Sequence, residues 1–158
     1  PGVGSTGPVA AVHACGGHLR ARDRARELVA AEPMVRDPIN LAWGPDGRMW
    51  VVEMADYPSG MDGQGKPGGR IRVLESTRGD GYYDRATLFA DGLKSPTSVL
   101  PWRDGVLVTS VPNVLFLQDT DGDGRYDKVV PFLEGVAFPS SVMPWRKGAL
   151  QSASMVPA

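Results

Sequence analysis

The sequence predicts an all-β fold, and three observations support this prediction. Glycine and proline supply 20 and 14 of the 158 residues, which is typical of a chain with many turns. From Asp37 onward, short apolar runs alternate with segments rich in Gly, Pro, Asp and Asn. Residues 74–110 also align without a gap on residues 117–153, at an offset of 43 residues, and 17 of the 37 aligned pairs are identical. We therefore expect a four-stranded unit that repeats along the chain.

A period of about 40–45 residues with four strands is the size of one blade of a β-propeller. The first unit is predicted to have strands at 39–43, 48–54, 70–75 and 85–90. The second unit is predicted to have strands at 97–100, 106–110, 113–118 and 128–133. One blade cannot bury both of its faces alone, so neighbouring blades are expected to stack around an axis.

The predicted domain organisation has two parts, of which the larger is a partial β-propeller at residues 36–158. It comprises about two and a half blades, at 38–95, 96–138 and, truncated, 139–158. Closed propellers have about 4–8 blades, so the missing blades of a parent chain are an expected partner. A twisted β-sandwich is the alternative arrangement of the same strands.

The smaller part is an N-terminal extension at residues 1–35. Residues 19–32 are rich in Ala, Arg, Leu and Glu, which are good helix formers. The apolar positions Leu19, Leu28 and Val29 make only a weak stripe. We therefore expect this segment to be either a short helix or disordered.

Charge and composition limit the expected partners. The formal net charge is -1, so no overall positive field attracts nucleic acid. No apolar run approaches the roughly 18–20 residues of a membrane helix, so no transmembrane segment is expected in these residues. No signal-peptide pattern is seen. Cys15 is the only cysteine, so no disulfide can form within one chain.

The most specific local motif is an acidic loop at residues 119–127. Asp119, Asp121, Asp123 and Asp127 stand at its positions one, three, five and nine, and glycine stands at position six. Calcium takes about 6–8 oxygen ligands, and glycine permits the sharp turn that brings carboxylates together. The main-chain carbonyl of Arg125 is expected to add a neutral oxygen. We predict a calcium site here, and the alternative is a hairpin turn held by side-chain hydrogen bonds alone.

The equivalent loop of the first unit, residues 76–84, provides an internal control. Ser76 and Arg78 replace the first two carboxylates, while Asp80 and Asp84 remain. Arg78 puts a positive charge at the position predicted for the metal. We therefore expect the first loop to hold no calcium.

The long loop at residues 55–69 is the second candidate site, because long loops on a rigid scaffold commonly carry function. Glu53, Tyr57 and Arg70 are the candidate catalytic residues, expected to line a pocket at one end of the propeller. The alternative is a mobile surface loop. No histidine lies between Asp37 and Ala158, so no Ser/His/Asp set is proposed within the blades.

Two segments resemble a known family: DPINLAWGPDGRMWVVEMADYPSGMDGQGKPGGRIRVLE at residues 37–75 and LPWRDGVLVTSVPNVLFLQDTDGDGRYDK at residues 100–128. They resemble the N-terminal β-propeller of bacterial proteins labelled membrane-bound dehydrogenases. Those proteins look related to soluble sugar dehydrogenases that use pyrroloquinoline quinone (PQQ), and to NHL-type propellers. The resemblance covers about residues 32–150.

This resemblance implies a quinoprotein-type dehydrogenase that acts on a sugar or an alcohol, with PQQ in the intact parent. It also implies export to the periplasm or the cell surface. The chain lacks a haem motif and has no histidine in its propeller part, so we expect it to be inactive by itself. The alternative is a non-enzymatic propeller, stabilised by calcium, that binds carbohydrate or protein at the cell surface. A purely structural module of a larger cell-surface protein is a third hypothesis.

Overall fold

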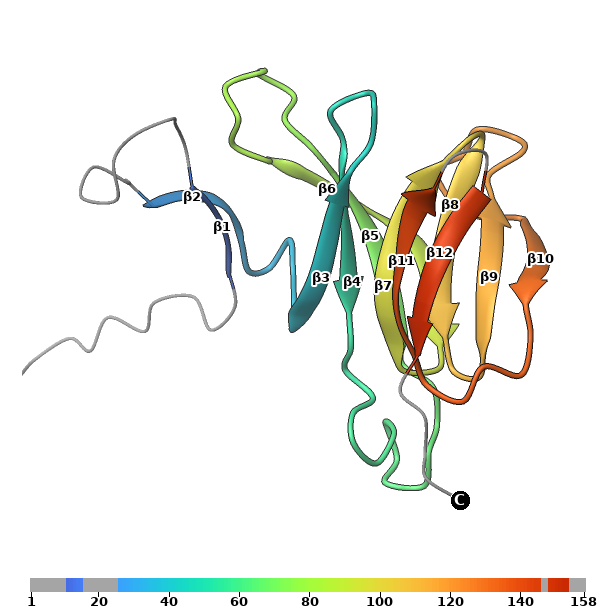
Figure 1. The fold of residues 1–158 in the computed structure, drawn as a ribbon. Coiled ribbons are helices and arrows are strands. Elements are labelled where there is room, and N and C mark those ends of the chain that lie inside the picture. Colours follow the sequence, from blue (N-terminus) through green and yellow to red (C-terminus); the bar gives the residue numbers. More distant parts are fainter. Residues whose placement is uncertain (1–10, 16–25, 146–147, 154–158) are drawn as a thin grey trace, which may run out of the picture.

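The computed structural model describes residues 11–15, 26–145 and 148–153. Within these residues the regular elements are twelve strands, so the expected all-β fold is confirmed for the described part. The strands form two four-stranded sheets and two two-stranded hairpins, all antiparallel (Figure 1).

The two four-stranded sheets are consecutive along the chain. The first sheet runs β3 (Pro38–Trp43), β4 (Met49–Glu53), β5 (Gly69–Glu75) and β6 (Arg85–Leu93). The second sheet runs β7 (Pro96–Trp102), β8 (Gly105–Ser110), β9 (Asn113–Gln118) and β10 (Lys128–Leu133). All eight predicted strands are present, because alternating apolar residues and the Gly, Pro and Asp turns between them are local signals.

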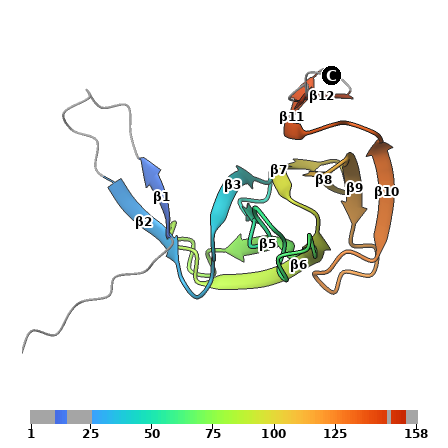
Figure 2. The ribbon, with the colours of Figure 1, turned by 90° about the horizontal axis from the view of Figure 1, so that it is seen from below.

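A hairpin stands at each end of this pair of sheets. At the N-terminal end β1 (Ala11–Cys15) pairs with β2 (Arg26–Ala31), and at the C-terminal end β11 (Pro139–Trp145) pairs with β12 (Gly148–Ala153). Seen from below, the four sets of strands follow one another in an arc, with β3, β7 and β11 on its inner side (Figure 2).

The prediction of a helix or disorder at residues 19–32 is wrong for residues 26–31, which form β2. Residues 19–25 lie outside the described part of the chain. Long-range contacts outweigh the helix propensity of this segment: the main-chain N–H of Tyr83 donates to the carbonyl oxygen of Val29 at 2.8 Å, and Val29 and Ala30 are buried.

Both faces of the first sheet are covered. One face packs on the second sheet through a core of Trp50, Val52, Ile71, Val73, Phe89, Val99, Val106, Val108 and Leu117. In this core the rings of Trp50 and Phe89 meet edge to face, with centroids 4.8 Å apart. The opposite face packs on the segment before β3 through Val29, Ala30, Val35, Met49, Val51, Leu74 and Tyr83.

The outer face of the second sheet contacts the C-terminal hairpin. Leu107 and Val114 pack with Val142 of β11 in a third, smaller cluster. Trp102 lies beside it, in edge-to-face contact with Phe116 and Phe132, and the guanidinium carbon of Arg103 lies 4.3 Å from the centroid of the Trp102 ring. Trp102 therefore packs within its own sheet.

The connecting loops lie at two opposite ends of the sheets. The β3–β4, β5–β6 and β9–β10 loops lie at the upper end in Figure 1, and the long β4–β5 loop lies at the lower end. The predicted calcium loop and the long loop are thus far apart, and the structure does not combine them into one site.

Candidate metal site

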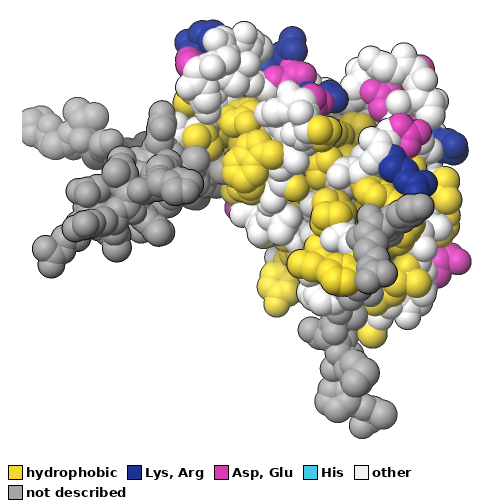
Figure 3. All heavy atoms as spheres, turned by 45° about the horizontal axis from the view of Figure 1, so that its top comes forward, with side chains coloured by type: hydrophobic (Ala, Val, Ile, Leu, Met, Phe, Trp, Pro, Cys, Tyr) yellow, Lys and Arg dark blue, Asp and Glu magenta, His cyan; other side chains and the backbone are white. Residues whose placement is uncertain are grey.

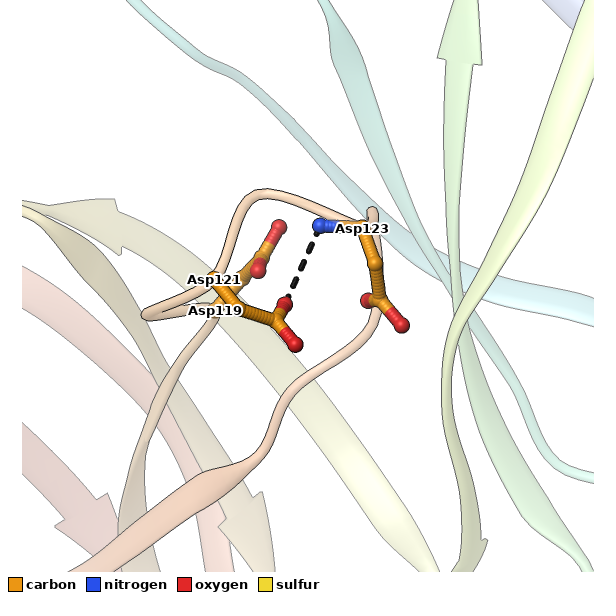
Figure 4. A group of neighbouring side chains, drawn as sticks. All are labelled: Asp119, Asp121 and Asp123. Carbon is orange, nitrogen blue, oxygen red and sulfur yellow. Dashed lines mark hydrogen bonds between the residues drawn. The ribbon is translucent and has the colours of Figure 1, made fainter.

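The candidate metal site is the hairpin loop between β9 and β10. The carboxylates of Asp119, Asp121 and Asp123 each offer an oxygen, and these oxygens lie within 4.8 Å of one another (Figure 4). Asp119 is half-buried, while the other two side chains are exposed. Three hard oxygen donors this close form part of the ligand set that calcium prefers.

Main-chain N–H groups hold the carboxylates in place. The N–H groups of Gly122 and Gly124 donate to Asp119 at 2.7 and 2.9 Å, and the N–H of Asp123 donates to Asp121 at 3.2 Å. Both glycines have a positive φ, 81° for Gly122 and 89° for Gly124, in the region that glycine adopts without steric cost. These glycines allow the tight turn in which several N–H groups point at one carboxylate.

The net effect on Asp119 is a pKa below the ordinary value of an aspartate. Desolvation, the largest single cause, raises this pKa, but hydrogen bonds within the loop, foremost those from the N–H groups of Gly124 and Gly122, together outweigh it. Asp119 is therefore ionised at neutral pH and carries the charge that a cation needs.

Asp127 is held apart from the three clustered carboxylates by another partner. Its two carboxylate oxygens accept hydrogen bonds from the main-chain N–H and the hydroxyl of Thr120, at 3.2 and 2.7 Å. The Arg125 N–H donates to Asp123 at 2.7 Å. Of the five predicted metal-binding residues, the structure thus brings three carboxylates together and gives Asp127 a role in the turn.

The β5–β6 loop repeats this turn without the acidic cluster. Asp84 accepts from the N–H and the hydroxyl of Thr77, at 2.9 and 2.8 Å, just as Asp127 accepts from Thr120. The loop differs at Arg78, whose guanidinium lies 3.1 Å from Asp80 and 3.6 Å from Asp84. Arg78 is the counterpart of Asp121, so one loop has a built-in cation where the other has a carboxylate.

A polar cleft of about 630 Å³ adjoins the acidic loop, between the two sheets. Arg48, Arg85 and Arg103 line it together with Asp119 and Asp123. Charged side chains of both signs gather over the loops of this end (Figure 3). Each of the three arginines has a partner: Arg48 pairs with Asp46, Arg85 with Glu75, and Arg103 stacks on Trp102. The charges of Arg48 and Arg85 are therefore offset by carboxylates within the cleft, whereas Arg103 contacts only the face of an aromatic ring.

Sequence reasoning did not identify this cleft, because its lining comes from four hairpin ends that are far apart in the chain. One signal in the sequence pointed to part of this lining: the charged residues Arg103 and Asp104 follow Trp102 in a turn that recurs in the repeat. Which loops meet across two sheets is, however, set by how those sheets pack.

Glu53, a candidate catalytic residue, is buried at the end of β4 and fully engaged. Its carboxylate accepts from the main-chain N–H of Arg36 at 2.8 Å and pairs with the Arg72 guanidinium at 3.0 Å. Ser110, at the end of β8, makes the matching bond to the N–H of Lys94 at 3.1 Å. In both sheets, the residue that ends the second strand thus binds the main chain just before the first strand. This equivalence favours a structural role for Glu53.

The other two candidates of the long loop do not converge with Glu53 on a pocket. The guanidinium of Arg70 pairs with Asp91 at 3.1 Å, on an exposed part of the sheet. Tyr57 is 73% exposed. The candidate side chains therefore do not fit an enclosed quinone-binding pocket.

Asp56 is a buried acidic residue of the long loop. One carboxylate oxygen accepts from the N–H of Ser95 at 2.9 Å, where Ser95 has a φ of 41°. The other oxygen has no hydrogen-bond partner among the described residues. Asp56 thus fixes the turn that leads from β6 into β7.

Fold and site together define an all-β protein of repeated four-stranded antiparallel sheets, with an acidic hairpin loop in one repeat. The chain belongs to the family described as "Domain of unknown function (DUF7133)", whose model matches residues 20–129 and again 114–155. The two matched stretches overlap at residues 114–129, as is expected where a chain repeats a unit. No curated protein and no solved structure matches the chain. The described residues contain no helix that is long and apolar enough to cross a membrane.

Proposed function

We propose that this chain is a segment of a β-propeller that binds one calcium ion in the loop at residues 119–127. The observation that carries the proposal is the pair of matched loops. The β5–β6 loop neutralises its carboxylates with Arg78, whereas the β9–β10 loop has three clustered carboxylates. No lysine or arginine forms an ion pair with those three carboxylates among the residues that the structure describes.

The propeller arrangement is supported by the order and stacking of the strands. Each four-stranded sheet is a simple meander, and the last strand of one leads directly into the first strand of the next. The first strands β3, β7 and β11 lie on the inner side of the arc, where propeller blades have their first strands (Figure 2).

A cation in the acidic loop contributes stability, because calcium binds the folded loop and not the unfolded chain. At a calcium concentration about 100 times the dissociation constant, binding raises the free energy of unfolding by about 2.7 kcal/mol. The ion then holds the β9–β10 hairpin closed. This role is structural and needs no reacting group.

Titration calorimetry with calcium tests the proposal. We expect one site per chain, which is abolished in Asp121→Ala because the central carboxylate is lost. Asp80→Ala, in the equivalent loop of the first sheet, is the control and leaves binding unchanged. A chain that binds no calcium, or an Asp121→Ala variant that binds it normally, contradicts the proposal.

Asp127→Ala separates the ligands from the turn. We expect this variant to bind calcium more weakly but still measurably, and to lose about 1 kcal/mol of stability through the lost Thr120 bonds. Asp84→Ala should also be destabilised, because it loses the equivalent bonds to Thr77. Complete loss of calcium binding in Asp127→Ala would make Asp127 a ligand, as the sequence pattern predicts.

The dehydrogenase activity that the family resemblance implies stays a prediction about a parent protein. The single observation in its favour is the length of the β4–β5 loop at one end of the sheets. We propose that any PQQ or substrate site lies outside the side chains of Glu53 and Arg70, because both are committed to ion pairs. Periplasmic or cell-surface location is likewise a proposal from the resemblance.

A further inference from the structure

The acidic loop between β9 and β10 also contacts the first sheet. The main-chain N–H of Tyr126, near the end of the loop, donates to the carbonyl oxygen of Phe89 on β6 at 3.1 Å. The rings of these two residues have centroids 6.3 Å apart, and Tyr126 packs against the core cluster between the sheets. The residue beside Asp127 is therefore fixed to the last strand of the preceding sheet.

Gly124 makes a second contact with β6 and also holds the acidic cluster. A β-carbon at this position would lie 3.3 Å from the Cγ2 methyl group of Thr87, so the main chain of the loop lies close against that side chain. The N–H of the same glycine donates to the carboxylate of Asp119 at 2.9 Å. One short stretch of main chain, residues 124–126, therefore connects the acidic cluster to the first sheet.

The equivalent loop of the first sheet is fastened in a different way. Tyr83, the repeat equivalent of Tyr126, donates its main-chain N–H to the carbonyl oxygen of Val29 on β2 at 2.8 Å. Its hydroxyl also accepts from the indole N–H of Trp43 at 2.9 Å and donates to the carbonyl oxygen of Gly47 at 3.0 Å. Among the described residues, the hydroxyl of Tyr126 has no such partners. The second tyrosine is therefore fastened by fewer bonds than the first.

The two loops also differ in how their charges are balanced. The first loop has an arginine beside its carboxylates, whereas the second collects three carboxylates whose oxygens lie within 4.8 Å of one another. Like charges at this distance repel, and the repulsion favours loop conformations that spread them apart. A bound cation removes that repulsion and so favours the compact turn in which residues 124–126 meet the first sheet.

We propose that calcium in the acidic loop latches the second sheet onto the first, and that Tyr126 is the positioning residue of this latch. The inference rests on the proposed calcium site. Calcium holds the turn in the form that contacts β6, and the contact with β6 in turn holds the carboxylates together. Calcium binding and the sheet contact are therefore linked, and such linkage is reciprocal: the factor by which calcium strengthens the contact is the factor by which the contact strengthens calcium binding.

Hydrogen exchange followed by mass spectrometry tests the latch in the unsubstituted chain. Saturating calcium should slow exchange in the acidic loop and also in peptides that cover β6, because the loop closes over that strand. Strand β3, at the opposite edge of the same sheet, is the internal control and should be slowed less. In Asp121→Ala, which lacks the central carboxylate, added calcium should change the exchange of neither region.

Calcium calorimetry of three variants tests the reciprocal effect. Tyr126→Ala, which removes the ring contact with Phe89, should lower the calcium affinity by about fivefold or more, since coupling between linked sites typically starts at that size. Tyr126→Phe keeps the ring and should bind calcium as the unsubstituted chain does. Tyr83→Ala is the matched control: it loses the equivalent contact of the first loop, and it should leave the calcium affinity unchanged even where it lowers the stability toward urea.

Three outcomes would overturn the latch and leave the calcium site in place. They are calcium that slows exchange in the acidic loop alone or equally in β3 and β6, a Tyr126→Ala variant of unchanged calcium affinity, and a Tyr83→Ala variant that loses affinity to the same degree. If Tyr126→Ala does not fold, the exchange measurement on the unsubstituted chain decides the question by itself. A chain that binds no calcium in calorimetry overturns the calcium site, and the latch with it.

Discussion

At the scale of single residues, Glu53 shows how a buried carboxylate is used for structure. It is 2% exposed, and it serves both the Arg36 main-chain N–H and the Arg72 guanidinium. A charge in such a place is stable only when it is paired and hydrogen-bonded. Both conditions are met without any substrate or cofactor.

Replacing Glu53 by alanine is therefore expected to destabilise the fold. The partly buried Arg72 guanidinium loses its counter-charge and the Arg36 N–H loses its acceptor, at a cost of about 3 kcal/mol. Urea unfolding followed by circular dichroism measures this change. Glu53→Gln keeps an acceptor for the Arg36 N–H and should cost less; equal stability of Glu53→Ala and the unsubstituted chain would refute the structural role.

Aspartates in the hairpin loops also make the stability depend on pH. The pKa of Asp84 is lowered, first by the main-chain N–H and then by the hydroxyl of Thr77, and the pKa of Asp119 is lowered by the N–H groups of Gly124 and Gly122 against an opposing desolvation. Because these pKa values are lower in the folded chain, the unfolded chain binds more protons in acid. Their stabilising contribution is complete above the unfolded pKa of about 3.9 and is lost as the pH falls through the folded values.

We therefore expect the urea midpoint to change little between pH 7 and pH 5 and to fall below about pH 4. Asp84→Asn keeps a hydrogen-bond acceptor but does not titrate, so its midpoint should fall less steeply in acid. A midpoint that is unchanged down to pH 2.5 would show that these hydrogen bonds do not favour the ionised carboxylates.

At the scale of elements, the contact between the two four-stranded sheets contains the largest cluster of the described core. Phe89 of β6 stands at its centre, against Trp50 of β4 and near Tyr126, which comes from the β9–β10 loop. Neither sheet can bury this apolar face alone, so the two sheets are expected to unfold together.

Phe89→Ala tests this coupling, and its repeat equivalent Phe132→Ala provides a matched control. Removing the buried Phe89 ring leaves a cavity and should cost about 3–5 kcal/mol, whereas Phe132 is 42% exposed and should cost much less. Denaturant unfolding of both variants measures the difference. Similar losses in the two variants would contradict this expectation and would mean that Phe132 is also buried in solution.

At the scale of the whole molecule, the described residues form a β scaffold with a candidate metal loop, and the candidate residues Glu53, Tyr57 and Arg70 do not converge on a pocket. Proton or hydride abstraction from an alcohol needs a positioned base of suitable pKa, and no histidine lies within the two sheets. Glu53, which lies just before the long loop, is paired with Arg72.

We therefore expect no dehydrogenase turnover from this chain alone. The measurement supplies PQQ, calcium and a panel of sugars and follows the reduction of an artificial electron acceptor. Turnover that disappears in Glu53→Gln would contradict this expectation and would assign the reaction to the end of the sheets that holds the long loop.

The sequence by itself determined the features that are local. The eight strands from β3 to β10 follow from alternating apolar residues and from turn residues, and the 43-residue repeat fixed which loops are equivalent. The acidic cluster could also be predicted, because Asp119, Asp121, Asp123 and the intervening glycines are neighbours in one hairpin.

Only the tertiary structure decided the features that depend on distant residues. Residues 26–31 form a strand, and the hydrogen bond between Val29 and Tyr83 links that strand to the first sheet. Glu53 forms an ion pair with Arg72, and Asp127 accepts a hydrogen bond from Thr120. The physical reason is that a polar group in a packed chain bonds to the partner that tertiary packing places next to it. The residues that neighbour the group in the sequence do not determine which partner that is.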